Sequence, residues 1–145
     1  SIEMFEALGH EYWKKYFKIL HSILKPGGKM IIQTITINNN DYSSYRRCSD
    51  FIQQYIFPGG LLPSPDIFKS TAVRQGFKYV GDFEFGLDYG LTLKRWEENF
   101  TRVLDKVKDL GFDDKFIRTW KFYLKYCQGG FEARKISVSQ FNFTK

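Results

Sequence analysis

The sequence has too few cysteines and histidines for the common metal and nucleophilic sites. Two of each are present in 145 residues. Cys48 and Cys127 show neither CxxC spacing nor a cluster of histidine partners, so no zinc site is predicted. A Ser–His–Asp set cannot be assembled either. With so little cysteine, we expect a reduced, intracellular compartment.

Long apolar runs are also missing. No stretch of eighteen apolar residues occurs, so no transmembrane helix is predicted, and Ser1 opens no signal peptide. We therefore expect a cytoplasmic chain whose contact with a membrane is peripheral, at the inner surface. Glycine-rich phosphate loops are missing too, because GxGxxG does not occur and each of the three Gly–Gly pairs is explained as a turn.

Aromatic side chains, in contrast, are abundant, at 19% of residues with 15 Phe and 9 Tyr. This content favours a chain that packs a wide apolar surface or cavity, with an aromatic-rich core as the alternative. The net charge of +6 suits an anionic partner such as a phospholipid surface or nucleic acid. Because the lysines are scattered along helix faces without a basic block, we interpret them as solvated and predict no nucleic-acid partner.

An αβ unit organises the N-terminal part of this single predicted domain. A helix from Tyr12 is closed by the turn at 24–28, and its apolar side consists of Trp13, Tyr16, Phe17, Leu20, Ile23 and Leu24. Lys29–Ile37 is rich in Ile and Thr, which predicts a strand, and its almost wholly apolar first half predicts burial on both faces. Chemistry in doubly wound folds lies beyond the carboxyl ends of strands, which places Gln33–Ile37 near any active site.

The remaining elements follow from the same kinds of pattern. We predict helices over 45–57, 64–75, 88–108 and from Asp113 to a break at Gly129-Gly130, and strands over 77–85 and 134–143. Ser64 is expected to cap the second of these helices and Gly76 to end it. Gly81 is the weak point of its strand. A change of apolar parity between Val138 and Phe141 predicts a bulge or two-sided burial.

The first ten residues have the pattern of a strand end running into a loop, so we expect a part of the domain to precede Ser1. Glu6 stands there between apolar neighbours, and an apolar setting raises the pKa of a carboxyl group unless a partner offsets it. This side chain is expected either to cap the following helix or to orient a base or an anion-bound proton. The residues alone favour the cap.

Six stretches carry a family resemblance. The most specific are IFPGGxLPS at 56–64 and DYxxTLxxW at 88–96, and the others are Ser1–Gly9, Leu24–Gly28, Gln33–Thr36 and Phe131–Arg134. In order and approximate spacing they resemble the cyclopropane-fatty-acyl-phospholipid synthases, a family that includes the mycolic acid cyclopropane synthases. The resemblance covers nearly the whole chain.

The resemblance implies an α/β fold, with residues 1–145 forming the C-terminal half of a class I, Rossmann-like S-adenosylmethionine methyltransferase domain. In this mixed sheet, Lys29–Thr36 runs parallel to Phe77–Phe85, the last strand lies antiparallel between them, and helices are inserted. The implied activity is transfer of a methylene or methyl group from S-adenosyl-L-methionine to the double bond of an unsaturated phospholipid acyl chain, forming a cyclopropane ring. The family's glycine-rich cofactor loop and ribose-binding acid would lie before Ser1.

The resemblance also implies a site for a bicarbonate or carbonate ion, which serves as the base in ring closure. Glu6, Ile35 and Tyr89 match the family's anion-binding residues, and Gln33 stands where many members have histidine. A glutamine can donate an N–H to the anion but carries no titratable proton. Glu6 and Tyr89 are therefore the predicted catalytic residues in this part of the site.

Cys127 matches the cysteine that is often assigned as the family's active-site residue. Since methylation of an alkene needs no nucleophile, the alternative is a buried thiol packed on Trp120 and Leu124. The aromatic residues of 45–57 and 91–120 fit a tunnel for an acyl chain, with ordinary core packing as their alternative. Two other functions stay open: a methyltransferase that leaves a branched methyl or acts on another small molecule, and a non-catalytic lipid-binding fragment. Homo-oligomerisation is also left open.

Overall fold

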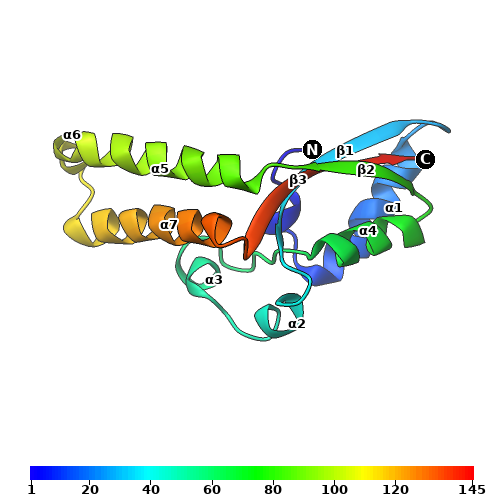
Figure 1. Ribbon diagram of the computed structural model, residues 1–145, viewed down its shortest axis with the longest axis horizontal. Coiled ribbons are helices and arrows are strands. Elements are labelled where there is room, and N and C mark those ends of the chain that lie inside the picture. Colours follow the sequence, from blue (N-terminus) through cyan, green and yellow to red (C-terminus); the bar gives the residue numbers. More distant parts are fainter. The chain divides into compact units, whose positions relative to one another are not determined.

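The computed structural model describes all residues from Ser1 to Lys145. The chain forms two compact units, which are described separately. Residues 1–85 and 136–145 form the sheet unit, and residues 86–135 form the hairpin unit, which consists of helices. Both are drawn in Figure 1.

The sheet has three strands in the order β1-β3-β2 (Figure 1). They are β1 (Lys29–Ile37), β2 (Lys78–Glu84) and β3 (Ile136–Thr144). β3 pairs antiparallel with both neighbours, so β1 and β2 run in the same direction. The predicted mixed sheet, with its last strand antiparallel between two parallel strands, is confirmed.

The irregularity of the sheet lies in β2 and not in the last strand. The register of β2 against β3 shifts between Tyr79 and Gly81, next to the glycine predicted as its weak point. β3 pairs with β1 without interruption. Of the two outcomes predicted for β3, two-sided burial is the observed one, because Val138 and Ser139 are both buried although adjacent strand residues point to opposite faces.

An aromatic core covers one face of the sheet. α1 (Trp13–Ile23) and α4 (Pro65–Arg74) supply Phe17 and Phe68, both fully buried. The ring centroid of Phe68 lies 4.7 Å from that of Phe141 on β3, and the ring centroid of Phe17 lies 6.4 Å from that of Phe143. Phe5 completes the cluster, with its ring centroid 4.8 Å from that of Phe68.

The predicted burial of β1 on both faces is wrong. Met30, Ile32, Thr34 and Thr36 are buried, whereas Ile31 between them is 56% exposed. The physical reason is that α1 and α4 pack on one face only, and the strand's side chains alternate between the faces. Ile23, predicted on the apolar side of α1, is likewise exposed at the last position of that helix.

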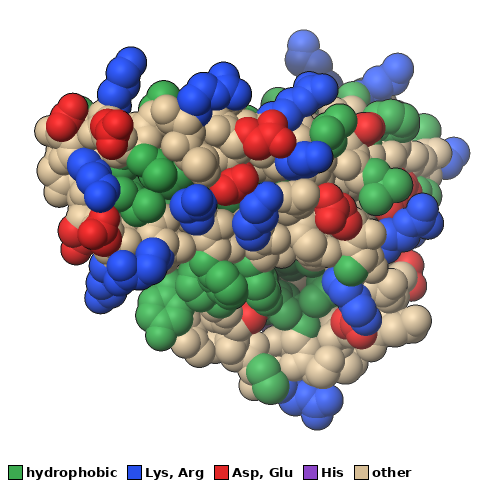
Figure 2. Space-filling view, turned by 60° about the vertical axis from the view of Figure 1, so that its left-hand side comes forward, with side chains coloured by type: hydrophobic (Ala, Val, Ile, Leu, Met, Phe, Trp, Pro, Cys, Tyr) green, Lys and Arg blue, Asp and Glu red, His purple; other side chains and the backbone are tan.

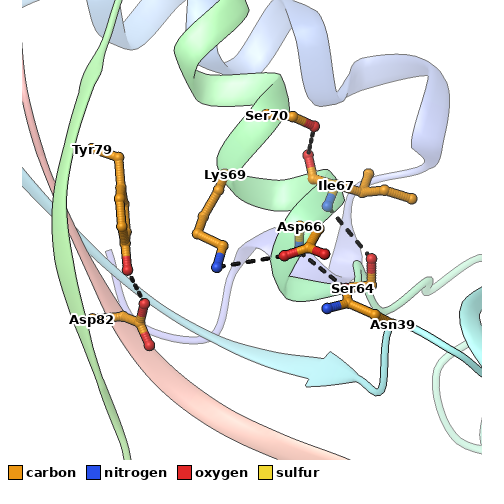
Figure 3. Close-up of polar contacts among 8 residues, drawn as sticks. All are labelled: Asn39, Ser64, Asp66, Ile67, Lys69, Ser70, Tyr79 and Asp82. Carbon is orange, nitrogen blue, oxygen red and sulfur yellow. Dashed lines mark hydrogen bonds and ion pairs between the residues drawn. The ribbon is translucent and has the colours of Figure 1, made fainter.

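The start of α4 agrees with its predicted capping. Pro65 takes the first helical position, and the Ser64 hydroxyl accepts a hydrogen bond from the backbone N–H of Ile67 (Figure 3). The Asp66 backbone N–H donates to Asn39 Oδ1, 3.1 Å away, which ties the loop after β1 to this helix. Gly76, with φ +95°, follows the C-terminal end of α4 as predicted.

The single helix predicted over 45–57 is replaced by two short ones. They are α2 (Tyr42–Tyr45) and α3 (Phe51–Tyr55). Asp50 separates them because its side chain and that of Gln53 form a reciprocal capping box, which starts a new helix.

The hairpin unit contains α5 (Gly86–Arg102), α6 (Leu104–Asp109) and α7 (Asp114–Glu132). The helix predicted over 88–108 is therefore interrupted at Val103. Asp113 caps α7 as predicted, with its carboxylate accepting from the Phe116 N–H at 2.7 Å. The predicted break at Gly129-Gly130 is wrong, because glycine weakens a helix without forbidding helical torsion angles. The helix ends at Glu132, and Arg134, two residues later, has φ +54°.

Phe68→Ala is expected to lower the free energy of unfolding by about 3–5 kcal/mol, since it removes a fully buried ring that contacts helices and sheet. Urea unfolding of the protein measures this loss. The control is Val73→Ala on the same helix, where the side chain is 49% exposed and the expected change is below about 1 kcal/mol. Equal effects of the two substitutions would contradict the packing described.

Candidate functional site

The edge of β1 that faces away from β3 pairs with the first residues of the chain, which run parallel to it. Ile2 forms a parallel bridge with Gln33. The Gln33 N–H donates to the Ser1 carbonyl oxygen, and the Glu3 N–H donates to the Gln33 carbonyl oxygen, both at 2.9 Å. The predicted strand end before residue 10 is therefore present as this bridge. It brings the residues after Glu3 to the carboxyl end of β1, where ligands bind in such sheets.

Glu6 continues this edge with its side chain. The chain turns through η1 (Phe5–Ala7), and Glu6 Oε1 accepts a hydrogen bond of 2.5 Å from the Ile35 N–H. The carboxylate thus takes the place that the next carbonyl group of a parallel strand would have. The prediction that Glu6 caps the following helix is wrong: it lies in η1, and Tyr12 is the N-cap residue of α1.

The second carboxylate oxygen of Glu6 has an unmet hydrogen-bonding capacity. Oε2 is buried without a partner in the chain. Burial raises the pKa of Glu6, and the nearby charge of Glu3 raises it further. The hydrogen bond from the Ile35 N–H is the largest opposing effect, and it lowers the pKa without cancelling the increase. The site therefore favours a proton, or a donor from a ligand, at Oε2.

Gln33 lies on the same edge as Glu6, and both the nitrogen and the oxygen of its side-chain amide form hydrogen bonds. Its Nε2 donates to Glu3 Oε1 at 2.8 Å, and its Oε1 accepts from Gln140 Nε2 at 3.0 Å. Gln33 can still donate through the second N–H of Nε2, as predicted for an anion-binding role. Ile35, in contrast, has its N–H engaged with Glu6, and its carbonyl oxygen accepts from the Thr34 hydroxyl at 3.3 Å, so one lone pair of that oxygen is left at this edge for a ligand.

The other two predicted residues belong to the hairpin unit. Tyr89 is in the first turn of α5, and its ring centroid lies 4.9 Å from that of Phe131. Cys127 lies on α7 and is partly buried. The structure thus brings Glu6, Gln33 and Ile35 together within the sheet unit, and it places Tyr89 and Cys127 in the separately described unit.

The hairpin unit contains an aromatic groove between α5 and α7 with a volume of about 360 Å³. Its lining consists of Trp96, Asn99, Phe100, Trp120, Tyr123 and Leu124. Four of these residues are aromatic, so part of the aromatic content lines a concave surface. Trp96, Phe100 and Trp120 belong to the 91–120 segment, for which a tunnel for an acyl chain and ordinary core packing both stay predictions.

Lysine and arginine side chains are dispersed among acidic ones on the surface shown in Figure 2. This agrees with the absence of a basic block in the sequence. None of the helices combines the length and apolar character needed to cross a membrane.

Three residues at or near the site were not identified from the sequence. Glu3 and Gln140 contact Gln33, and Tyr16 on α1 has a buried hydroxyl. Burial raises the pKa of Tyr16, the contact with Ser1 lowers it, and the charge of Glu6 raises it. Gln140 had one usable signal, since it is a polar residue within the apolar part of the last strand. The sequence contains no comparable signal for Glu3 or Tyr16.

The fold, in which a last strand runs antiparallel between two parallel strands, is that of S-adenosylmethionine-dependent methyltransferases, the class of its solved structural neighbours. Within that class, the chain belongs to the mycolic acid cyclopropane synthetase family, whose model matches residues 1–141.

Three relatives illustrate the membership. The chain is 38% identical, over its whole length, to the tuberculostearic acid methyltransferase UfaA1 of Mycobacterium tuberculosis, and 32% identical to the cyclopropane-fatty-acyl-phospholipid synthase of Escherichia coli. The crystal structure of mycolic acid cyclopropane synthase CmaA1 complexed with SAH and CTAB has a TM-score of 0.91 and 28% identity, with all of this chain and 54% of that one covered. The chain spans about a third of the two curated relatives, 34% and 36% respectively.

The raised pKa of Glu6 predicts a specific pH dependence of stability. Below its ordinary value of 4.5 the carboxyl group is neutral in both folded and unfolded states, and its contribution is fully present. That contribution is lost as the pH rises through the higher pKa of the folded state. We expect the stability difference between wild type and Glu6→Gln to shift in favour of the variant from pH 4.5 to neutrality. Urea unfolding over this range measures it, and a shift in favour of the wild type would contradict the raised pKa.

Proposed function

We propose that the complete enzyme transfers a one-carbon group from S-adenosyl-L-methionine to the double bond of an unsaturated phospholipid acyl chain and forms a cyclopropane ring. The observation that carries this proposal is the half-buried Glu6 side chain at the carboxyl end of β1, whose Oε2 is buried and unpaired, in a chain of this family. The curated relatives include a cyclopropane-fatty-acyl-phospholipid synthase.

S-adenosyl-L-methionine, when bound, supplies an electrophilic methyl group on a sulfonium ion. A solved relative bound to SAH supports this cofactor. We assign none of residues 1–145 to its recognition, since no glycine-rich loop occurs among them. The role of this chain is to shape the region beyond β1 in which the acceptor reacts.

The residues at the β1 edge fit a bicarbonate ion. Glu6 Oε2 is a buried oxygen without a partner, Gln33 Nε2 has an N–H to donate, and the Ile35 carbonyl can accept from the ion's hydroxyl group. Bound bicarbonate would supply the base for the proton that is lost when the ring closes. Two bare anions repel each other, so Glu6 must share a proton with the ion, which its raised pKa favours.

Tyr89 is the fourth proposed anion ligand, with its hydroxyl as a donor. Cys127 is the remaining proposed active-site residue. Its position on a helix that lines the aromatic groove allows either a role next to the acceptor or packing on Trp120 and Leu124.

The proposed partner is the acyl chain of an unsaturated phospholipid, reached by peripheral contact with the membrane. The groove lined by Trp96, Phe100, Trp120 and Tyr123 supports an apolar ligand, and a solved relative is bound to CTAB. An apolar surrounding also serves the reaction, because water reaching a carbocation would give a hydroxylated product.

Methyl transfer without ring closure is the second candidate. It is favoured by the relative with 38% identity, whose name describes a methyltransferase and not a cyclopropane synthase. Both candidates are tested by incubating the complete enzyme with S-adenosyl-L-methionine and vesicles of unsaturated phospholipid, followed by NMR analysis of the acyl product. Cyclopropane protons support the first candidate and a branched methyl the second. Unchanged lipid would contradict both.

Tyr89→Phe in the complete enzyme should lower turnover by on the order of 100-fold, the usual range for general acid–base contributions, with little change in lipid binding. Excess bicarbonate should restore part of the activity if the variant has merely lost affinity for the ion. Tyr12→Phe is the control, since Tyr12 is 53% exposed in the sheet unit and outside the site. Full activity of Tyr89→Phe in bicarbonate-depleted buffer would remove Tyr89 from the site.

Residues 1–145 alone should not bind S-adenosyl-L-methionine tightly, because they contain no GxGxxG segment and no assigned ribose acid. Isothermal titration calorimetry of this chain measures the affinity directly. A dissociation constant in the micromolar range would show that these residues hold the cofactor by themselves.

A further inference from the structure

We propose that Gln140 and Glu3 are positioning residues that hold the amide of Gln33 in one orientation, with its nitrogen presented to the anion site. This inference rests on the bicarbonate site of the proposed function. It adds to that site the two side chains that orient Gln33 as a hydrogen-bond donor.

Gln140 reaches Gln33 because the two residues are direct partners across the β1–β3 pair. Side chains on opposite residues of an antiparallel pair lie close enough to interact. The Gln140 Nε2 donates to Gln33 Oε1 at 3.0 Å. β3 pairs with β1 without a bulge, so this contact is fixed by the register of the sheet.

Glu3 is held on the other side of Gln33 by its backbone. It has φ +49°, a conformation that is uncommon for residues other than glycine. Its N–H donates to the carbonyl oxygen of Gln33, which anchors this conformation. The carboxylate is thereby placed 2.8 Å from Gln33 Nε2.

The carboxylate of Glu3 decides the orientation of the amide. An ionised carboxylate only accepts, so Glu3 requires the Gln33 nitrogen, and the Gln33 oxygen then accepts from the Gln140 nitrogen, 3.0 Å away. A rotation of the Gln33 amide by half a turn would place its oxygen against the Glu3 carboxylate and replace that hydrogen bond by a repulsive contact. The Gln140 amide can present nitrogen or oxygen, so Gln140 supports the orientation that Glu3 sets.

The consequence is a donor of fixed direction in the site. Nε2 carries two N–H groups, of which one is bonded to Glu3 and the second is left for an oxygen of the ion. An imidazole at this position would change its charge near pH 6.5. The amide has no such transition, so its orientation, and not its protonation, decides whether it can donate.

The test uses the complete enzyme with S-adenosylhomocysteine bound and ¹³C-labelled bicarbonate, whose binding is followed by ¹³C NMR without lipid. Gln140→Leu removes the donor to Gln33, and Gln140→Glu reverses its polarity. We expect bicarbonate affinity to fall by about tenfold in the Leu variant, which corresponds to roughly 1.4 kcal/mol, and by more in the Glu variant. In turnover assays, the KM for bicarbonate should rise while kcat at saturating bicarbonate stays near that of wild type.

Gln75→Leu and Gln75→Glu are matched controls, because Gln75 lies at the end of α4, the helix on the core side of the sheet. They make the same changes of side chain and charge and should bind bicarbonate as wild type does. Wild-type affinity in both Gln140 variants would overturn the inference, as would an equal loss in the Gln75 controls. Wild type that binds no bicarbonate would overturn the anion site and this inference together. If that enzyme still converts lipid, methyl transfer stands without the ion.

Discussion

The hydrogen bond between the Glu6 carboxylate and the Ile35 N–H is the interaction on which the site depends. The backbone pairing of residues 1–3 with β1 stops at Glu3, and without Glu6 the next N–H of β1 would be left at the edge without a protein partner. A carboxylate accepts this bond well, but burying its charge raises the energy of the ionised form. The same geometry therefore satisfies the strand and leaves Oε2 in need of a proton or a ligand.

The aromatic core sets the position of Glu6. Phe5 is fully buried, with its ring centroid 5.2 Å from that of Trp13 and 4.8 Å from that of Phe68. Since Phe5 and Glu6 are consecutive residues of η1, fixing one side chain in the core directs the other to the β1 edge. The Leu61 N–H donates to the Glu6 carbonyl oxygen at 3.0 Å, which joins the loop before α4 to the same turn. The packing that stabilises the sheet unit thus also orients the carboxylate.

The strands and the αβ unit could be predicted because their apolar periodicity and turn residues are local. Two predicted helix boundaries were wrong. The capping box at Asp50 starts a new helix within 45–57, and the long helix α7 tolerates the glycines at 129–130. Glu6, Gln33 and Ile35 were predicted as site residues from the family resemblance, and the structure brings them together at the β1 edge. Gln140 was not identified, because its contact with Gln33 depends on the register of β3 against β1. Apolar alternation does not distinguish between registers that differ by two residues.

The glutamine at residue 33 changes which groups can hold a proton at this edge. An amide neither takes up nor releases a proton at physiological pH, so Gln33 can only orient a ligand. Glu3 is bonded to that amide, and its negative charge raises the pKa of Glu6. The carboxyl group of Glu6 is therefore the side chain of this edge best suited to hold a proton. The burial of the Glu6 carboxyl group, and not the protonation of an imidazole at residue 33, determines how readily the proton is retained when an anion lies next to it.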